Sequence, residues 1–402
     1  MKRAPSRKAV KRGVRAARWH HRSACVLSND VVELTALHGG GHVASFRFLS
    51  GSQNPSVNAL WEAPWETGDP GKAQAKKLAP HYGPRFVGKF LASFTGHALC
   101  LDYFGAPSAE EIKAGLPLHG EAATATWELV SEKNNPVAPR AKWQARLPSA
   151  GLLFEREITL LPKSSVAFFK ESVTNQRPTD HLFHWVQHVT LGPPLLDPNT
   201  SKVFLSGKQA KSWPLGYEGK SLVASDRTFT WPMAPGEKGG RVNLALPFSK
   251  SGTGFVACVL LDPARNISFI AALNWEIGLV AGYCFQQQDF PWVAIWEENL
   301  ARSYAPWNGV TQARGMEFGT TPMPIGKEAI FRAGNLFRAP GWKCVPAYGK
   351  KNAWYASFLA VVPKDWRSIR GISLAKNSLL LLGANRNDVV KLHASGIQDL
   401  GR

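Results

Sequence analysis

Two histidines four residues apart are the first side chains in this sequence that suggest chemistry. His184 and His188 begin and end the segment HWVQH, a spacing that suits a metal ion when the segment is a helix. The glutamate of an H-E-x-x-H zinc site is absent, however, and the local residue pattern favours a strand. On a strand, positions i and i+4 lie about 13 Å apart, which is too far for two ligands of one ion. We therefore expect no metal site.

A third histidine and one glutamate stand in loop-like surroundings where a proton-transfer group could sit. His119 follows a loop and precedes the segment that contains Trp127, and Glu317 is the one carboxylate in residues 315–322, among apolar residues and glycines. Burial of such a carboxylate would raise its pKa. Two structural roles remain open from the residues alone. Glu317 could form a salt bridge with Arg314 or Lys327, and His119 could be a hydrogen-bonded core histidine.

Motifs that hold phosphates or activate a serine are missing from the sequence. There is no Walker motif and no G-x-S-x-G segment. The triple glycine at 39–41 is expected to form a tight turn, because no helix follows it that could hold a phosphate. We expect no cofactor.

The segments that must position these side chains have the character of strands. Short runs rich in β-branched and aromatic residues, bounded by Gly, Pro, Asn or Asp, recur along the chain. Helical periodicity is nearly confined to residues 108–114, where Ser108 and Glu111 resemble a capping box, and to 327–333. Residues 61–89 are expected to be a loop, since four prolines would block ladder hydrogen bonds there. The expected strands cover 26–34, 42–48, 124–130, 142–147, 152–161, 165–174, 181–189, 255–261, 267–274, 279–286 and 292–296.

This pattern predicts a mainly β protein built as a large antiparallel β-sandwich. No low-complexity linker divides the chain after residue 22, so we expect one domain over residues 23–402.

Basic residues are concentrated at the start of the chain. Of the 48 Lys and Arg residues, nine lie within residues 1–22, where there is no acid. We interpret residues 1–22 as a disordered basic tail. An RNA-binding or membrane-surface arm and an organelle-targeting presequence are the alternatives. The remaining 39 basic residues face 29 acidic ones, a balance that makes a nucleic-acid partner unexpected.

The apolar runs and the cysteines indicate where in the cell we expect this protein. No apolar run approaches the roughly 20 residues that cross a bilayer, so we expect no membrane partner, and the first 18 residues lack the apolar stretch of a secretory signal. The five cysteines are widely separated, odd in number and free of any C-x-x-C pair. Buried free thiols in a reducing compartment fit this pattern, and the expected location is the cytoplasm.

Several motifs, taken in their order along the chain, resemble the aldose 1-epimerase (galactose mutarotase-like) superfamily, including its hexose-6-phosphate branch. The resemblance extends from about Asp30 to the C-terminus. It rests on GGGHVAS at 39–45, GHALCLDYFG at 96–105, HGE at 119–121 with Trp127 behind it, HWVQH at 184–188 followed by GPP at 192–194, FPW at 290–292 leading to Trp296, and EFG at 317–319.

The resemblance implies a β-supersandwich with a sugar-binding cleft on one concave sheet face, and a cofactor-free reaction at the anomeric carbon. It implies that Glu317 takes the proton of the anomeric hydroxyl and that His188 protonates the ring oxygen. His119 matches a second histidine that contacts the sugar. The family's substrate-contacting arginine has no clean counterpart, and Lys89 is one of the nearest cations.

Further sugar contacts are expected from His97, Lys89, Trp185 and Trp296, since an indole can cover the apolar face of a sugar ring. Opening a hemiacetal needs a proton removed and another delivered a few ångströms away, which a Glu and His pair can do without a metal. The expected function is an isomerase that interconverts sugar anomers. The alternative is a non-catalytic carbohydrate-binding protein of the same fold. We expect a small-molecule carbohydrate as its partner, and a monomer or homodimer.

Overall fold

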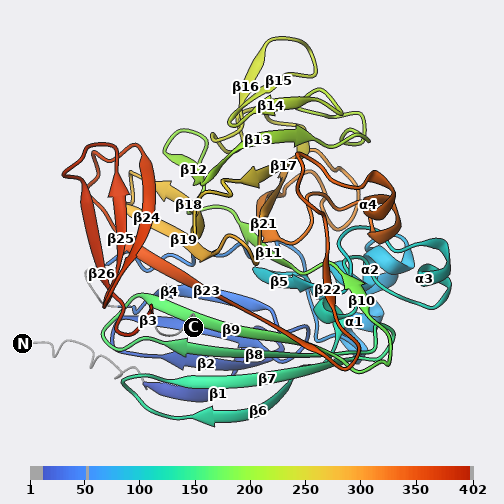
Figure 1. The fold of residues 1–402 in the computed structure, drawn as a ribbon, viewed down its shortest axis with the longest axis horizontal. Helices are drawn as coiled ribbons and strands as arrows, with labels where there is room; N and C mark the ends of the chain where they lie inside the picture. Colours follow the sequence, from blue (N-terminus) through green and yellow to red (C-terminus); the bar gives the residue numbers. More distant parts are fainter. Residues whose placement is uncertain (1–11, 51–53, 399–402) are drawn as a thin grey trace, which may run out of the picture.

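Two large antiparallel sheets dominate the computed structural model, which describes residues 12–50 and 54–398 (Figure 1). The 13-stranded sheet has the order β1 (Gly13–Trp19), β2 (Arg22–Ser28), β3 (Val32–Leu37), β4 (Val43–Phe48), β5 (His97–Cys100), β11 (Val186–Leu191), β21 (Gln312–Gly319), β20 (Trp292–Asn299), β17 (Thr253–Leu261), β13 (Gly207–Ser212), β14 (Thr228–Thr230), β15 (Met233–Pro235) and β16 (Arg241–Asn243).

The second sheet has eight strands, and two small sheets accompany it. Its order is β12 (Ser201–Leu205), β18 (Ile267–Asn274), β19 (Leu279–Gln286), β23 (Lys350–Val361), β9 (Val166–Asn175), β8 (Leu152–Leu160), β7 (Arg140–Leu147) and β6 (Glu128–Lys133). The small sheets are β10 (His181–Phe183) with β22 (Lys343–Val345), and β24 (Ile369–Ala375), β25 (Ser378–Gly383) and β26 (Val389–His393).

The main core lies between the two large sheets. Strands alternate their side chains between two faces, so the inward positions of both sheets meet in one buried cluster that includes Phe154, Phe169, Val189 and Phe318. A second cluster lies on the other face of the eight-stranded sheet, where β24–β26 cover residues such as Phe168 and Phe358. The mainly β antiparallel sandwich predicted from the sequence is confirmed.

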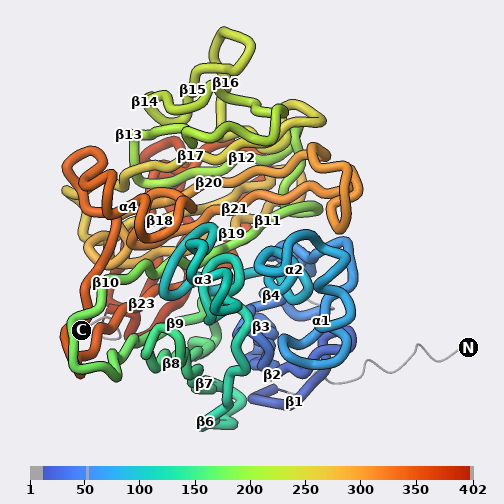
Figure 2. Tube along the Cα trace, turned by 90° about the vertical axis from the view of Figure 1, so that its right-hand side faces the viewer, coloured from blue at the N-terminus to red at the C-terminus, as the bar shows by residue number. Residues whose placement is uncertain are grey.

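The part of the chain that the structure describes has four short α-helices, and they lie together on one side of the molecule (Figure 2). They are α1 (Ala73–Leu78), α2 (Arg85–Leu91), α3 (Ala109–Lys113) and α4 (Lys327–Ala333), and the 3-10 turns η1 (Ala79–His81) and η2 (Ala122–Thr124) accompany them. The capping box of Ser108 and Glu111 is present at α3, and α4 coincides with the predicted segment. The prediction of a loop over 61–89 is wrong for α1 and α2. Pro84 is the N-cap residue of α2 and Pro80 lies in the first turn of η1, and proline is tolerated at both places because no intrahelical N–H bond is lost.

The predicted tail over residues 1–22 needs correction. β1 pairs along its whole length with β2, and the Arg15 guanidinium reaches Glu33 at 2.7 Å. Arg22 is buried and donates hydrogen bonds to the backbone oxygens of Ser93 and Gly39. Residues 13–22 are therefore part of the sheet. Their positive charges suit an edge strand, where they oppose pairing with a second chain. Residues 1–11 lie outside the described part of the chain.

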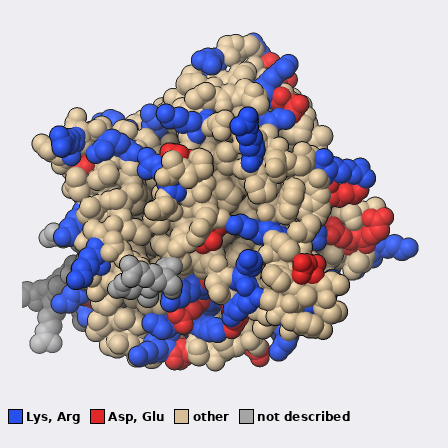
Figure 3. All heavy atoms as spheres, viewed as in Figure 1, with Lys and Arg blue, Asp and Glu red and all other residues tan. Residues whose placement is uncertain are grey.

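All five cysteines are unpaired, and all except the half-buried Cys344 are buried, as predicted for free thiols. On the face drawn in Figure 3, Lys and Arg side chains are scattered, with Asp and Glu among them. Across the described residues, no helix has the length and apolar character needed to cross a membrane.

Candidate functional site

A cavity of about 600 Å³ opens on the face of the 13-stranded sheet that turns away from the eight-stranded sheet. Strands β11, β17, β20 and β21 contribute to it, as do α2, α4 and six loops. It is lined by Phe90, Leu91, Phe94, Phe104, Gly105, Ala106, Leu118, His119, His188, Trp213, Pro214, Leu215, Val256, Ala294, Trp296, Arg302, Trp307, Glu317, Pro324, Ile325 and Ala329.

Strand register brings His188 and Glu317 to the same place. His188 lies opposite Ala98 of β5, and Glu317 lies opposite Ala294 of β20. Directly opposed residues share a sheet face, so both side chains project into the cavity beside small neighbours. His188 Nε2 lies 3.3 Å from Glu317 Oε1. The two residues to which the family resemblance assigns proton transfer are therefore in direct contact.

Glu317 is a buried carboxyl group with few partners. Its side chain is 2% exposed, and burial raises its pKa well above the ordinary value. Its Oε1 accepts no hydrogen bond from any described residue. The carboxyl group folds back over Gly315, where an added Cβ would come within 2.0 Å of Oε1. The position of the carboxyl group thus requires a glycine two residues earlier on β21.

His188 is held in a neutral form by the same burial. Desolvation lowers its pKa to about 3, and its Nδ1 lies 3.2 Å from the hydroxyl oxygen of Thr190. The raised pKa of Glu317 and the lowered pKa of His188 both favour the form of the pair that holds one proton, on the carboxyl group. A carboxylate beside an imidazolium holds the same number of protons. The two forms differ only by a proton transfer over the 3.3 Å contact.

His119 packs against His188 and presents one hydrogen-bond donor. The two rings meet edge to face with centroids 5.2 Å apart. The Gly105 N–H donates to His119 Nδ1 at 3.1 Å, and burial, followed by the charge of His188, lowers the pKa of His119 well below its usual range. A neutral ring that accepts at Nδ1 carries its proton on Nε2. His119 also has a left-handed backbone, with φ of 66°.

Arg302 is a cation of the cavity that the sequence reasoning missed. Its guanidinium lies between the rings of Tyr217 and Trp307, 4.7 and 4.8 Å from their centroids. It donates to Glu218 at 2.9 Å and lies 3.6 Å from Glu298. Trp296 lines the cavity, and its indole N–H donates to the Tyr217 hydroxyl. No motif pointed to Arg302, and two of its neighbours, Tyr217 and Glu218, lie on a loop distant in sequence.

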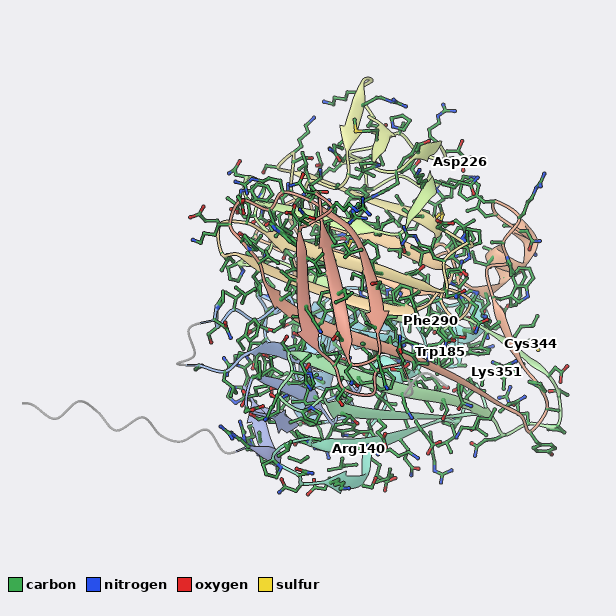
Figure 4. All side chains as sticks on the ribbon, turned by 60° about the vertical axis from the view of Figure 1, so that its left-hand side comes forward. Arg140, Trp185, Asp226, Phe290, Cys344 and Lys351 are labelled. Atoms are coloured by element: carbon green, nitrogen blue, oxygen red, sulfur yellow. The ribbon has the colours of Figure 1, made fainter. Side chains whose placement is uncertain are left out.

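Three residues predicted to contact the sugar do not line this cavity, which corrects those expectations. His97 bonds to Gln187 at 2.9 Å in the inter-sheet core, one residue out of phase with the cavity face. The Trp185 indole donates to Glu171 and packs against Phe290, beside which Figure 4 labels it. Lys89 donates to the Gly115 oxygen and lines a different surface hollow.

The salt bridge left open for Glu317 is not formed, whereas His119 is buried and hydrogen-bonded, as the structural role left open for it predicted. Arg314 bonds to Glu297 within the core, and Lys327 bonds to Asp102 at 2.6 Å, so neither pairs with Glu317. His119 lines the cavity, although it also accepts a backbone hydrogen bond.

The i, i+4 histidines do not converge. His184 accepts a hydrogen bond from the Phe104 N–H at Nδ1, whereas His188 faces the cavity. Within residues 12–50 and 54–398, no three His, Cys, Asp or Glu side chains are grouped so that they could hold a metal ion.

The cavity walls are largely aromatic and aliphatic, and most of these residues could not be recognised in the sequence. Phe90 and Phe94 come from α2 and the turn after it, Phe104 follows β5, and Trp213 follows β13. The signal that could have found them is weak, because an aromatic residue in a β-sandwich is more often core.

Comparison with known proteins identifies the fold. The chain is similar to a galactose mutarotase-like protein from Clostridium acetobutylicum, with a TM-score of 0.55 and 11% identity over 87% of this chain and 98% of that one. It is also similar to a galactose mutarotase related enzyme from Lactobacillus acidophilus, with a TM-score of 0.51 and 11% identity over 84% and 98% of the two chains. No protein-family model matches the sequence, and no curated protein matches it significantly.

These likenesses show that the chain has the galactose mutarotase-like fold, as the order of its motifs predicted. At such low identity they bear on the fold alone, and activity must be argued from the site.

Proposed function

We propose that this protein interconverts the anomers of a reducing sugar, with Glu317 and His188 exchanging protons with the substrate. The observation that carries the proposal is the contact between a carboxyl group and an imidazole, both buried, at 3.3 Å on the wall of a cavity large enough for a sugar. The two oxygen atoms on an anomeric carbon are separated only by that carbon. Neighbouring acid and base groups therefore suit them.

Ring opening follows from the proton count of the pair. Hydroxyl groups of a bound sugar solvate the carboxylate and imidazolium form. Glu317 then takes the proton of the anomeric hydroxyl, and His188 gives its proton to the ring oxygen. The bond between the anomeric carbon and the ring oxygen breaks, with its electron pair remaining on the ring oxygen, while the anomeric carbon becomes a carbonyl. Rotation about the C1–C2 bond and the reverse proton transfers close the ring as the other anomer.

Burial of Glu317 and His188 stabilises the protonation state that follows ring opening. After the two transfers, Glu317 is protonated and His188 is neutral, and the raised pKa of the first and the lowered pKa of the second both favour that state. His119 Nε2–H is placed to donate to a sugar oxygen, and the Trp296 ring covers one wall. Each proton-transfer group could contribute about 10²–10⁴-fold to the rate.

The test is anomer exchange measured by NMR exchange spectroscopy on a panel of aldoses. Wild-type protein should accelerate exchange above the buffer rate, and Glu317→Gln, which keeps the shape and removes the basic oxygen, should lower the acceleration by about 10²–10⁴-fold. A Glu155→Gln variant alters a carboxylate that pairs with Lys142 and Lys350, away from the cavity, and should leave exchange unchanged. Equal rates in wild type and Glu317→Gln would refute the proposal. Sugar binding without exchange would favour the alternative of a carbohydrate-binding protein.

A further inference from the structure

The lining of the cavity is poor in polar side chains for a site that would hold a sugar. Of its 21 residues, only His119, His188, Arg302 and Glu317 carry ionisable side chains. The others are glycine, proline, aliphatic or aromatic, and they come from all sides: Leu215, Val256 and Ile325 belong to three different elements or loops. A free hexose carries a hydroxyl group on nearly every carbon. Each of these groups needs a hydrogen-bond donor or acceptor in the cavity.

Most of the polar atoms in the cavity are already committed. His188 and Glu317 are taken by the anomeric centre in the proposed reaction. Arg302 donates to Glu218 and lies close to Glu298, and the Trp296 indole donates to Tyr217.

Few side-chain donors remain for the other hydroxyl groups. They are His119 Nε2–H and the indole N–H groups of Trp213 and Trp307, and that of Trp213 is buried without a hydrogen-bond partner among the described residues. A hydroxyl group buried without a partner weakens binding about tenfold or more.

The volume of the cavity also indicates a ligand larger than a free monosaccharide. About 600 Å³ is the range of pockets that enclose drug-sized ligands, so a monosaccharide would leave apolar wall uncovered. One apolar wall is formed by Trp213, Leu215 and Val256. Val256 lies opposite Trp296 in the sheet, and the Leu215 side chain is mostly exposed.

We infer that the substrate is a reducing sugar that carries an apolar substituent, such as an acyl ester, away from its anomeric carbon. This inference rests on the proposed function for the position of the sugar, and on the composition of the wall for the substituent. A phosphate group in place of the acyl group is disfavoured, because Arg302 is the only cation among the described lining residues and carboxylates already neutralise it.

The experiment compares matched substrates. Glucose, galactose and mannose, their 6-O-hexanoyl esters and their 6-phosphates are each assayed for anomer exchange, and their binding is measured by calorimetry. Burial of each methylene group is expected to improve binding by up to about fourfold, so for at least one sugar the ester should exceed its parent at least tenfold in kcat/KM. The 6-phosphates should be weaker than the parents.

Two valine substitutions test where the substituent lies. Val256→Thr preserves shape and places a hydroxyl group in the apolar wall, so the ester-to-parent ratio should fall at least threefold. Val389→Thr makes the same change on β26, at a half-exposed side chain remote from the cavity lining, and the ratio should stay as in wild type.

The outcomes separate the two proposals. Exchange of parent sugars equal to or faster than that of the esters, or tighter binding of a 6-phosphate, would overturn the inference while leaving the proposed isomerase intact. A ratio that Val256→Thr does not change would also overturn it. If no sugar is exchanged but an ester binds at least tenfold more tightly than its parent, the inference stands and the isomerase proposal fails. If no ester binds, the inference fails.

Discussion

Buried polar groups at the two faces of β11 differ in hydrogen bonding. Those at the inter-sheet face are all paired, whereas some at the cavity face have no partner among the described residues. Gln187 points into the inter-sheet core, where its amide bonds to Glu171 at 2.6 Å and its oxygen accepts from Arg156. Arg156 and Glu171 pair at 2.6 Å with both side chains almost fully buried, and Tyr355 donates to Glu171. None of these side chains has a buried polar atom left without a partner. This face is a closed hydrogen-bond network.

The cavity face of the same strand, represented by His188, has an incomplete set of hydrogen bonds. His188 is paired only loosely with Thr190 and Glu317, and Glu317 Oε1 and Trp213 Nε1 have no hydrogen-bond partner among the described residues. A satisfied network fixes one structure, whereas a buried group without a partner retains its capacity to bind a ligand and keeps a shifted pKa. Under the proposed function, the first set of polar groups supports the fold and the second takes part in the chemistry.

The largest expected effect tests the closed face. Glu171→Gln removes the charge that balances Arg156 and should lower the free energy of unfolding by about 3–5 kcal/mol, because a buried guanidinium is left uncompensated. Urea unfolding measures it. Glu155→Gln, on the strand paired with that of Glu171, breaks a more exposed contact with Lys142 and Lys350 and should cost at most about 1 kcal/mol. Equal costs for the two variants would mean that the network does not support the fold.

The second prediction concerns the pH dependence of stability on the cavity face. The native state keeps the Glu317 proton above about pH 4.3, where the unfolded chain releases it. Relative to Glu317→Gln, wild-type stability should therefore fall with rising pH by about 1.4 kcal/mol per pH unit, until the raised pKa is reached.

His188 should produce the opposite slope. Its native pKa of about 3 lies below the unfolded value near 6.5, so the native state binds fewer protons between these values. Relative to His188→Asn, wild-type stability should rise from pH 3 to pH 6.5. Urea unfolding at half-unit pH steps measures both differences. Parallel curves for wild type and both variants would show that neither pKa is shifted.

The third prediction moves the carboxyl group without removing it. Gly315→Ala forces Glu317 Oε1 away from a Cβ that would lie 2.0 Å from it, and a displacement near 1 Å can lower turnover by about 10²-fold. The fold should survive, because the displaced atom is the end of a flexible side chain. Gly371→Ala is the matched control, since its Cβ would meet only Leu382 at 3.8 Å. Anomer exchange that is unchanged in Gly315→Ala would argue against Glu317 as the base.

The smallest effect is expected at His119. His119→Asn keeps a donor group and a residue type that tolerates a left-handed backbone, so the fold should be retained while the donor is shortened. Loss of one hydrogen bond to the sugar should raise KM by about 2–12-fold and change kcat little. A fall in kcat with an unchanged KM would instead place His119 in the proton transfers.

Several features could be predicted from the sequence because they depend on local pattern. Alternation and turn residues located most of the central strands, from β7 through β9 and from β17 through β20. The capping box located α3. Strands with irregular patterns were missed, including β21, whose glycines resemble a loop, and β1, whose arginines resemble a tail.

Proximity of the site residues was decided by the tertiary structure. Glu317 and His188 could be proposed from the family resemblance, but their contact depends on the pairing of β11 with β21 across more than a hundred residues of chain. The sequence placed both His97 and His188 at the expected site, and the register of β5 against β11 sends them to opposite faces. Arg302, Trp213 and Leu215 come from loops without any motif.

The sequence by itself determined that this chain forms a large antiparallel β-sandwich, because strand periodicity and turn residues act over a few neighbouring positions. It also carried, through the order of its motifs, the resemblance to the mutarotase-like fold. Only the tertiary structure decided which polar side chains face the core and which face the cavity. A shift of one residue in strand register reverses every side chain, and register is set by partners that are distant in the sequence.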